Sequence, residues 1–119
     1  MSHPMRYLLL GIFLLLLVTV PVAMKLPGQG TLEGVVSNET GPLAKASVET
    51  RNLITGADLH AISGSDGQYR IDGLSPGKYS VWVHAEEHTA VWIPMLVVES
   101  GTVTRKDFLL LRIRPITGS

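Results

Sequence analysis

Cysteine is absent from this chain of 119 residues, and charged residues are few and balanced. The lack of cysteine excludes disulfide bonds, cysteine nucleophiles, thiolate metal sites and a lipid-modified cysteine after a signal sequence. Ten lysines and arginines match ten aspartates and glutamates, so there is no basic excess for nucleic acid and no acidic tail. A folded body of this size must therefore be held together by packing alone.

Helical periodicity is missing from residue 31 onward, where short extended segments alternate between apolar and polar residues. Seven such segments end at turn signals, at residues 31–37, 46–52, 58–63, 68–74, 78–85, 90–98 and 102–111. A spacing of roughly ten residues between strands is typical of an all-β sandwich. Pro94 has no N–H to donate, so the sixth segment is predicted to be an edge strand or to carry a bulge.

The clearest hairpin is GQYRIDGLSPGKYSVWV at residues 67–83, where glycine and proline interrupt the alternation. Because side chains alternate between the two faces of a strand, parity predicts which residues are buried. The predicted core positions are Leu32, Gly34, Val36, Ala46, Val48, Tyr69, Ile71, Tyr79, Val81, Val83, Phe108 and Leu110.

The N-terminal residues 1–24 differ from the rest of the chain. Residues 7–24 contain no charge and would reach about 27 Å as a helix, near the lower limit for crossing a bilayer. Arg6 precedes this run and Lys25 follows it, which predicts a cytoplasmic N-terminus and an exported body. Residues 25–30, KLPGQG, are predicted to be a linker.

Whether residues 1–24 are a membrane anchor or a cleaved signal peptide is left open by the sequence. A cut after Ala23 would place Pro21 at the −3 position, which fits poorly, whereas a cut after Gly30 would be acceptable but distant from the apolar run. We therefore expect an extracytoplasmic domain, either anchored through residues 7–24 or secreted. Residues 112–119 have no pattern and are expected to be a loose tail.

Several stretches together resemble a carboxypeptidase regulatory-like domain. They are LEGVV at 32–36, GPLAKASV at 41–48, TG at 55–56, SDGQYRIDGLSPGKYSV at 65–81 and DFLL at 107–110. The resemblance covers residues 31–111 and implies a seven-stranded Greek-key β-sandwich of the prealbumin-like type. It also implies a structural or binding module that is not catalytic. The chain departs from the family pattern at Glu86-Glu87-His88, where a glycine and an aromatic residue are common.

Trp82 has the parity opposite to that of its buried neighbours and should leave the core face. If the fifth and sixth strands form a hairpin about Glu87, Trp82 lies opposite Trp92, and His84 lies on the same face. Exposed aromatic pairs bind sugar rings, peptides or partner proteins, so these three residues form the candidate binding site. The alternative is that the tryptophans pack under a loop or rest near a lipid surface.

Two short motifs have weaker functional interpretations. The run His84-Ala85-Glu86-Glu87-His88 fits the letters of an inverted zinc-protease motif, but that motif requires a helix and this segment leaves a strand. We therefore predict neither a metal site nor a cofactor. Asn38-Glu39-Thr40 matches a glycosylation sequon in a predicted exposed turn, although asparagine is also an ordinary turn residue.

Three functions follow from these observations. The leading hypothesis is a non-catalytic, exported or membrane-anchored module that binds a partner protein or a glycan through Trp82, His84 and Trp92. The second is a structural accessory subunit of a cell-envelope membrane complex, held by its apolar helix. The third is a small metal-dependent hydrolase using His84, Glu87 and His88, for which no third ligand or suitable helix is evident.

Overall fold

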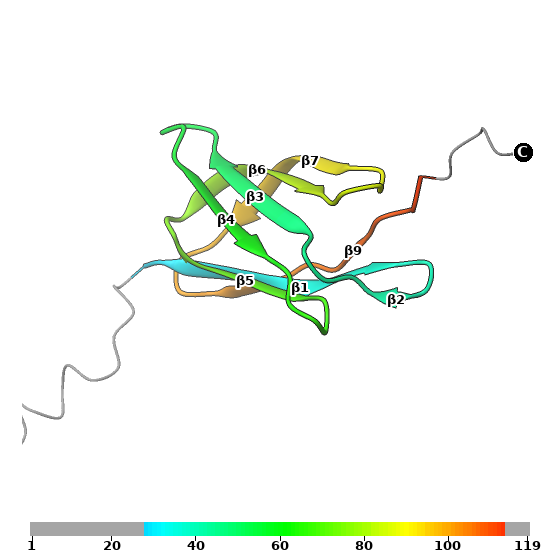
Figure 1. The fold of residues 1–119 in the computed structure, drawn as a ribbon. Coiled ribbons are helices and arrows are strands. Elements are labelled where there is room, and N and C mark those ends of the chain that lie inside the picture. The colour runs from blue at the N-terminus through cyan, green and yellow to red at the C-terminus, as the bar shows by residue number, and fades with distance from the viewer. Residues whose placement is uncertain (1–27, 114–119) are drawn as a thin grey trace, which may run out of the picture.

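The computed structural model describes residues 28–113, which form a sandwich of two β-sheets (Figure 1). The predicted N-terminal helix at residues 1–24 falls outside the described residues. Within residues 28–113, no helix is long and apolar enough to cross a membrane. The predicted all-β sandwich is confirmed for the described part of the chain.

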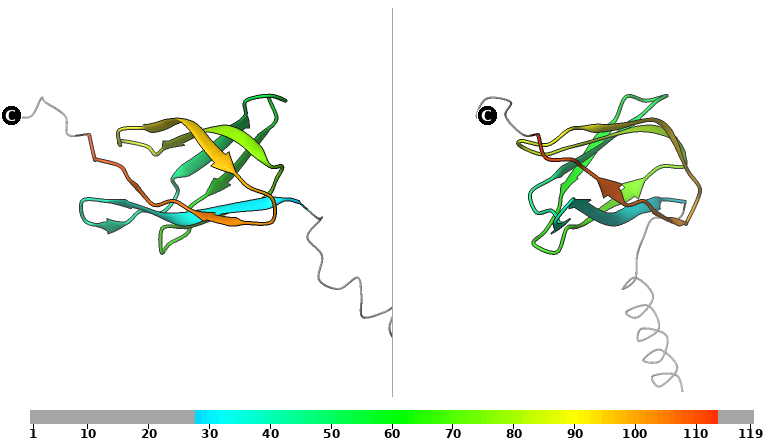
Figure 2. Two further views of the ribbon diagram at one scale, coloured as in Figure 1. Left: turned by 180° about the vertical axis from the view of Figure 1, so that it is seen from behind. Right: turned by 90° about the vertical axis from the view of Figure 1, so that its right-hand side faces the viewer.

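Nine strands within residues 28–113 make up the two layers. Figure 2 shows these layers from two further sides. The five-stranded sheet is built around β1 (Gly30–Asn38), with β2 (Gly41–Pro42) and β5 (Gln68–Leu74) antiparallel to it and β8 (Val103–Arg105) and β9 (Phe108–Leu109) parallel to it. The four-stranded sheet has the order β4 (Asp58–Ile62), β3 (Ser47–Asn52), β6 (Gly77–His84) and β7 (Val91–Val98). Because β3 pairs with β6 although two strands intervene in the chain, the hairpins are joined in Greek-key fashion.

The seven predicted strands are all present, but the seventh is divided into β8 and β9, and the short strand β2 lies where the sequence predicted only a turn. The division falls at Lys106 and Asp107, where the backbone bends over Gly34 of β1. Lys106 still donates its N–H to the Glu33 carbonyl, whereas the N–H of Val35 is bonded by the Asp107 carboxylate at 2.9 Å. A side chain therefore replaces one backbone acceptor in the ladder, and the strand is interrupted at that point.

The buried core lies between the sheets and contains every position predicted from parity. Sequence reasoning missed Leu74 and Val98, which close the core at the ends of β5 and β7. It also missed buried Thr31, because the register shifts between Gly30 and Leu32 and so changes the alternation. Each large core side chain contributes about 1.5 to 3 kcal/mol through burial, so these positions dominate stability.

Pro94 lies where the sequence placed it, on the edge strand β7 and inside an irregularity. Tyr79 pairs with Leu96 and Val81 with Ile93, so β7 carries one more residue than β6 between these pairs. A bulge at a sheet edge accommodates a residue that has no N–H. The prediction of an edge position or a bulge is confirmed on both counts.

The turn between β6 and β7 contacts the end of the described chain. Glu87 adopts a left-handed backbone conformation with a φ of 62°, and its carbonyl accepts the N–H of Ile113 at 2.8 Å. Arg112 forms a bridge with His88, and its N–H is bonded by the Glu39 carboxylate at 3.0 Å. Arg112 and Ile113, which the sequence assigned to a loose tail, are thus tied to two hairpins.

A buried hydroxyl holds the segment that leads into β3. Ser63 donates to the Leu43 carbonyl at 2.7 Å and accepts the Ala46 N–H at 2.9 Å. Ser63→Ala should lower the free energy of unfolding by about 1 to 2 kcal/mol, because both backbone groups lose a buried partner. Urea unfolding with an unchanged m value measures this change. Exposed Ser65 is the matched control, and an equal loss in Ser65→Ala would contradict this account.

Candidate functional site

The outer face of the four-stranded sheet presents the two tryptophans side by side. Trp82 on β6 pairs directly with Trp92 on β7, as the predicted hairpin about Glu87 requires. Their exposed fractions are 52% and 63%. Directly opposed residues in an antiparallel pair have Cβ atoms about 5 Å apart, so the two indoles form one apolar surface. The predicted pairing is confirmed, while its role in binding remains a prediction.

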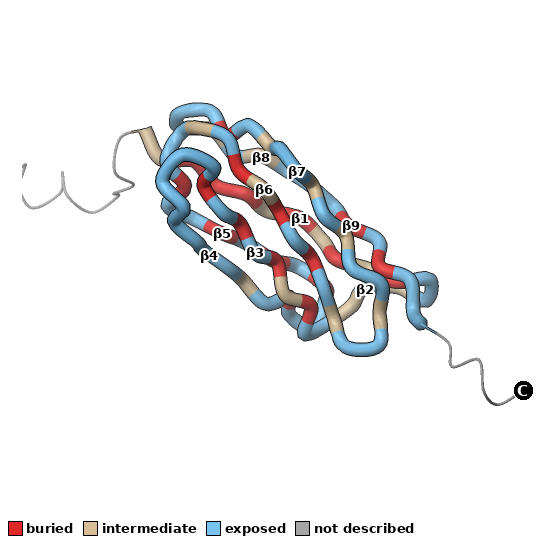
Figure 3. The backbone as a smooth tube through the Cα atoms, turned by 90° about the horizontal axis from the view of Figure 1, so that it is seen from above, coloured by how far each residue is buried: buried red, intermediate tan, exposed pale blue. Residues whose placement is uncertain are grey.

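This surface continues in register across all four strands. Trp82 pairs with Glu49 on β3, and Glu49 pairs with His60 on β4. Directly paired residues share a face, so a single row runs from His60 through Glu49 and Trp82 to Trp92. Figure 3, seen from above the sheet, shows exposed and buried residues alternating along β3 and β6. We call this exposed surface the Trp face.

His84 lies next to the row and contacts two of its members, Glu49 and Trp82. Its Nε2 atom lies 2.8 Å from Oε2 of Glu49. Its ring meets the Trp82 indole edge-on, with ring centroids 6.3 Å apart and an interplanar angle of 90°. The carboxylate and the indole are therefore both positioned by the same imidazole. All three predicted site residues, Trp82, His84 and Trp92, lie on the Trp face.

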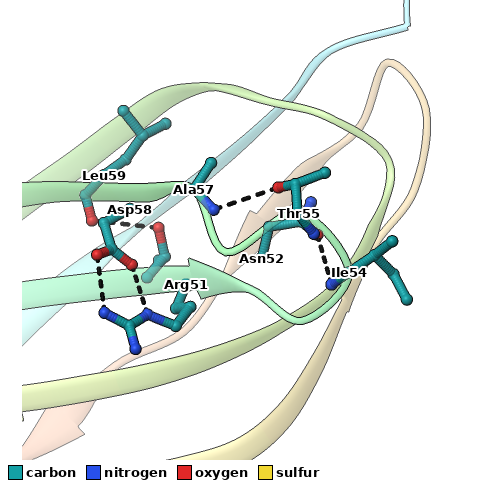
Figure 4. A network of polar contacts seen from close by, with 8 residues as sticks. Arg51, Asn52, Ile54, Thr55, Ala57, Asp58 and Leu59 are labelled. Atoms are coloured by element: carbon teal, nitrogen blue, oxygen red, sulfur yellow. Dashed lines mark hydrogen bonds and ion pairs between the residues drawn. The ribbon is translucent and has the colours of Figure 1, made fainter.

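A bidentate ion pair between β3 and β4 lies on the side of the row opposite to His84. Arg51 donates to the two carboxylate oxygens of Asp58 at 2.8 and 2.9 Å, as Figure 4 shows. The hydrogen bond from Arg51 lowers the pKa of Asp58, and the same bond raises the pKa of Arg51. The following turn is held by Asn52, whose Oδ1 accepts the N–H groups of Ile54 and Thr55 at 2.9 and 3.0 Å.

The Trp face contains an open groove with a volume of about 390 Å³. Trp82, Trp92, Glu49, Arg51, Asp58 and His60 all line it. Small-molecule sites range from about 300 to 1,000 Å³ and combine apolar walls with a few placed polar groups. The groove therefore has the size and composition of a site for a small ligand or for a segment of a larger one.

Sequence reasoning missed Glu49, Arg51, Asp58 and His60. The parity of Glu49 and Arg51 was readable, because both alternate with the predicted core positions Ala46 and Val48, whereas no core position was predicted in the segment that carries Asp58 and His60. What the sequence did not show was that β3 lies between β4 and β6, which brings these side chains next to Trp82. The pairing of β3 with β6 brings Glu49 next to His84, although the two residues are 35 positions apart in the chain.

The residues of the zinc-like motif do not converge. His84 pairs with Glu49, whereas His88 contacts the Asn38 side chain at 3.1 Å and the Glu86 carbonyl at 2.8 Å. The motif requires both histidines to project from one face of a helix, and the segment here is a strand end and a turn. Among residues 28–113, no group of three or more potential metal ligands is found.

Asn38 of the sequon is buried, with 8% of its surface exposed, which corrects the expectation that it lies in an exposed turn. Its Oδ1 accepts hydrogen bonds from the N–H and the hydroxyl of Thr40 at 2.9 and 2.8 Å. Its Nδ2, the atom that would carry a glycan, lies 3.1 Å from His88. The residue acts as a turn former, which is the commoner role of asparagine at such positions.

Solved structures with the same fold belong to proteins of different kinds. The chain resembles a provisionally assigned carbohydrate-binding protein from Bacteroides uniformis with 19% identity and a TM-score of 0.56, covering 70% of this chain and 41% of that one. It resembles a chain of a type II cohesin–X-dockerin complex from Acetivibrio cellulolyticus with 18% identity and a TM-score of 0.53, covering 70% and 58%.

An enzyme also shares the fold, namely 3-chlorocatechol 1,2-dioxygenase from Rhodococcus opacus, with 8% identity, a TM-score of 0.57 and coverage of 75% and 62%. The chain thus spans less than two thirds of the length of each of these three proteins. At such identities the likeness shows the fold alone. A comparison with curated protein sequences finds no match.

The family model of the carboxypeptidase regulatory-like domain matches residues 31–111. This range includes both sheets, the core and the Trp face. The matched range covers more than half of the 119 residues. The chain belongs to the carboxypeptidase regulatory-like domain family.

Proposed function

We propose that this protein is a non-catalytic binding module that holds a partner protein or a glycan on its Trp face. The observation that carries this proposal is the pair Trp82 and Trp92, directly opposed and more than half exposed. The other large aromatic side chains of the sandwich, Tyr69, Tyr79 and Phe108, are buried. Exposed, paired indoles are costly in water and are characteristic of surfaces that become covered on binding.

The structural neighbours support the same class of function without identifying the ligand. One is provisionally assigned as carbohydrate binding, and another comes from a complex between cohesin and dockerin modules. The dioxygenase likeness, at 8% identity, supports no transfer of activity. The match to the carboxypeptidase regulatory-like domain family is consistent with a module that is not itself catalytic.

The location we propose is outside the cytoplasm, with the module either anchored through residues 7–24 or released after cleavage. The support is the uncharged run itself, preceded by Arg6 and followed by Lys25. Protease added to intact spheroplasts should degrade the domain, and the intact mass of the purified protein should show whether residues 1–24 are retained. A domain protected until the membrane is lysed would contradict an extracytoplasmic location.

Co-purification from native membranes tests the binding role. The tagged full-length protein should retain its partner, and the double variant Trp82→Ala, Trp92→Ala should lose it, because the apolar surface is removed. Leu109→Ala is the matched control, since Leu109 is 56% exposed but lies on the other sheet. A partner kept by the double variant and lost when residues 7–24 are replaced by another apolar span would instead support the accessory-subunit hypothesis.

A further inference from the structure

The polar groups of the Trp face are hydrogen-bonded to one another within the face itself. Arg51 is engaged by both carboxylate oxygens of Asp58, and Glu49 is bonded to His84. An anionic ligand such as a phosphate or a nucleic acid strand would have to displace Asp58 from Arg51 before it gained a cation. The Arg51–Asp58 pair therefore favours a neutral ligand over an anionic one.

The polar groups also stand directly beside the indoles and not only at the periphery. Glu49 is opposite Trp82, and the His84 ring lies perpendicular to the same indole. Protein interfaces usually concentrate apolar side chains at the centre and keep charged groups at the rim. A ligand that fits this arrangement must offer an apolar surface and hydroxyl groups at the same place.

We infer that the groove binds a neutral glycan built from β-1,4-linked, glucose-type rings, an inference that rests on the proposed function of the Trp face. Such rings carry their hydroxyls equatorially, so both flat faces expose only C–H groups that can stack on an indole. The equatorial hydroxyls then point sideways, towards His84 on one side of the row and Arg51 on the other, and Glu49 accepts a hydrogen bond where the row continues beyond Trp82.

The row of side chains orients the bound glycan across the strands of the sheet. Trp92 and Trp82 lie on neighbouring strands, which are about 4.8 Å apart, close to the length of one sugar ring. A β-1,4-linked chain is extended and flat, so successive rings cover Trp92 and Trp82 and continue towards Glu49 and His60 across β3 and β4. An α-1,4-linked chain curves away from such a flat row.

Intrinsic fluorescence provides the test, because Trp82 and Trp92 are the only two tryptophans in the sequence. Full-length protein is titrated with cellohexaose, chitohexaose and maltohexaose in a detergent that has no sugar headgroup. A saturable change of tryptophan emission with cellohexaose or chitohexaose, at concentrations where maltohexaose gives none, is expected. No saturable change with either β-1,4-linked probe, or an equal response to maltohexaose, would overturn the inference.

Single variants distinguish the contribution of indole stacking to binding from the contribution of the polar side chains. Trp92→Ala keeps Trp82 as the reporter and should weaken binding at least tenfold, and Glu49→Ala should weaken it at least threefold. Leu109→Ala should change it less than twofold. Binding that is unchanged or strengthened in Glu49→Ala would indicate a purely apolar contact and would contradict the glycan.

The two proposals fail in different ways. If no glycan changes the emission but the double tryptophan variant loses its partner from native membranes, the glycan inference is wrong and the binding role of the Trp face stands. If the glycan titrations are negative and the partner is retained by the double variant, both proposals are wrong. A glycan response that depends on Trp92 and Glu49 supports both.

Discussion

Gly34→Ala should be the most damaging single methyl addition in the described part of the protein. A Cβ built on Gly34 overlaps the carbonyl oxygen of Lys106 and lies 2.7 Å from its carbonyl carbon. These atoms belong to the backbone between β8 and β9, which is fixed by the Tyr69 hydroxyl at 2.6 Å and by the Asp107 carboxylate. We expect a loss of about 3 kcal/mol or more, because the clash moves backbone and not a flexible side chain.

Thermal unfolding measures this effect. A loss of about 3 kcal/mol corresponds to a fall in Tm of about 12 °C or more for a domain of this size. Gly64→Ala is the matched control, because its nearest neighbour would be the Asp66 carboxylate at 3.4 Å, an exposed and movable group. If Gly34→Ala and Gly64→Ala had similar Tm values, the close approach of Lys106 to β1 would be wrong.

The same contact explains where sequence reasoning stopped. Alternation along β1, β5 and β6 predicted the buried faces apart from Thr31 and Leu74, because each strand shows its own period in the sequence. The break at Lys106 could not be read in this way, since it depends on Gly34, about seventy residues earlier, leaving room for a second backbone. Gly34 itself was predicted only as a core-facing position, although its lack of a side chain is what the fold requires.

The candidate site shows the same division between local and distant information. The pairing of Trp82 with Trp92 was predictable, because both belong to one hairpin whose midpoint is Glu87. The contribution of Glu49 was not, because β4 and β5 separate β3 from β6 in the chain. Parity placed Trp82 and Glu49 outside the core, and only the strand order brought Glu49 into one groove with the tryptophans.

Val81 and Trp82 are neighbours in the chain, and their replacement by alanine should separate stability from binding. Val81 is 0% exposed and lies between Thr50 of β3 and Ile93 of β7. Val81→Ala should lower the free energy of unfolding by about 2 to 3 kcal/mol, through lost burial and the cavity that remains. Trp82→Ala removes an exposed side chain and a cross-strand contact, and should cost about 1 kcal/mol.

Urea unfolding and ligand binding must be measured on the same two variants. Val81→Ala, studied below its unfolding midpoint, should keep the partner or glycan response of the Trp face, because its side chain points into the core. Trp82→Ala should lose that response while remaining the more stable variant. If Trp82→Ala were as destabilised as Val81→Ala and bound its partner normally, the indole would be part of the packing that supports β6. The Trp face would then be a structural surface, and the binding role would have to lie elsewhere.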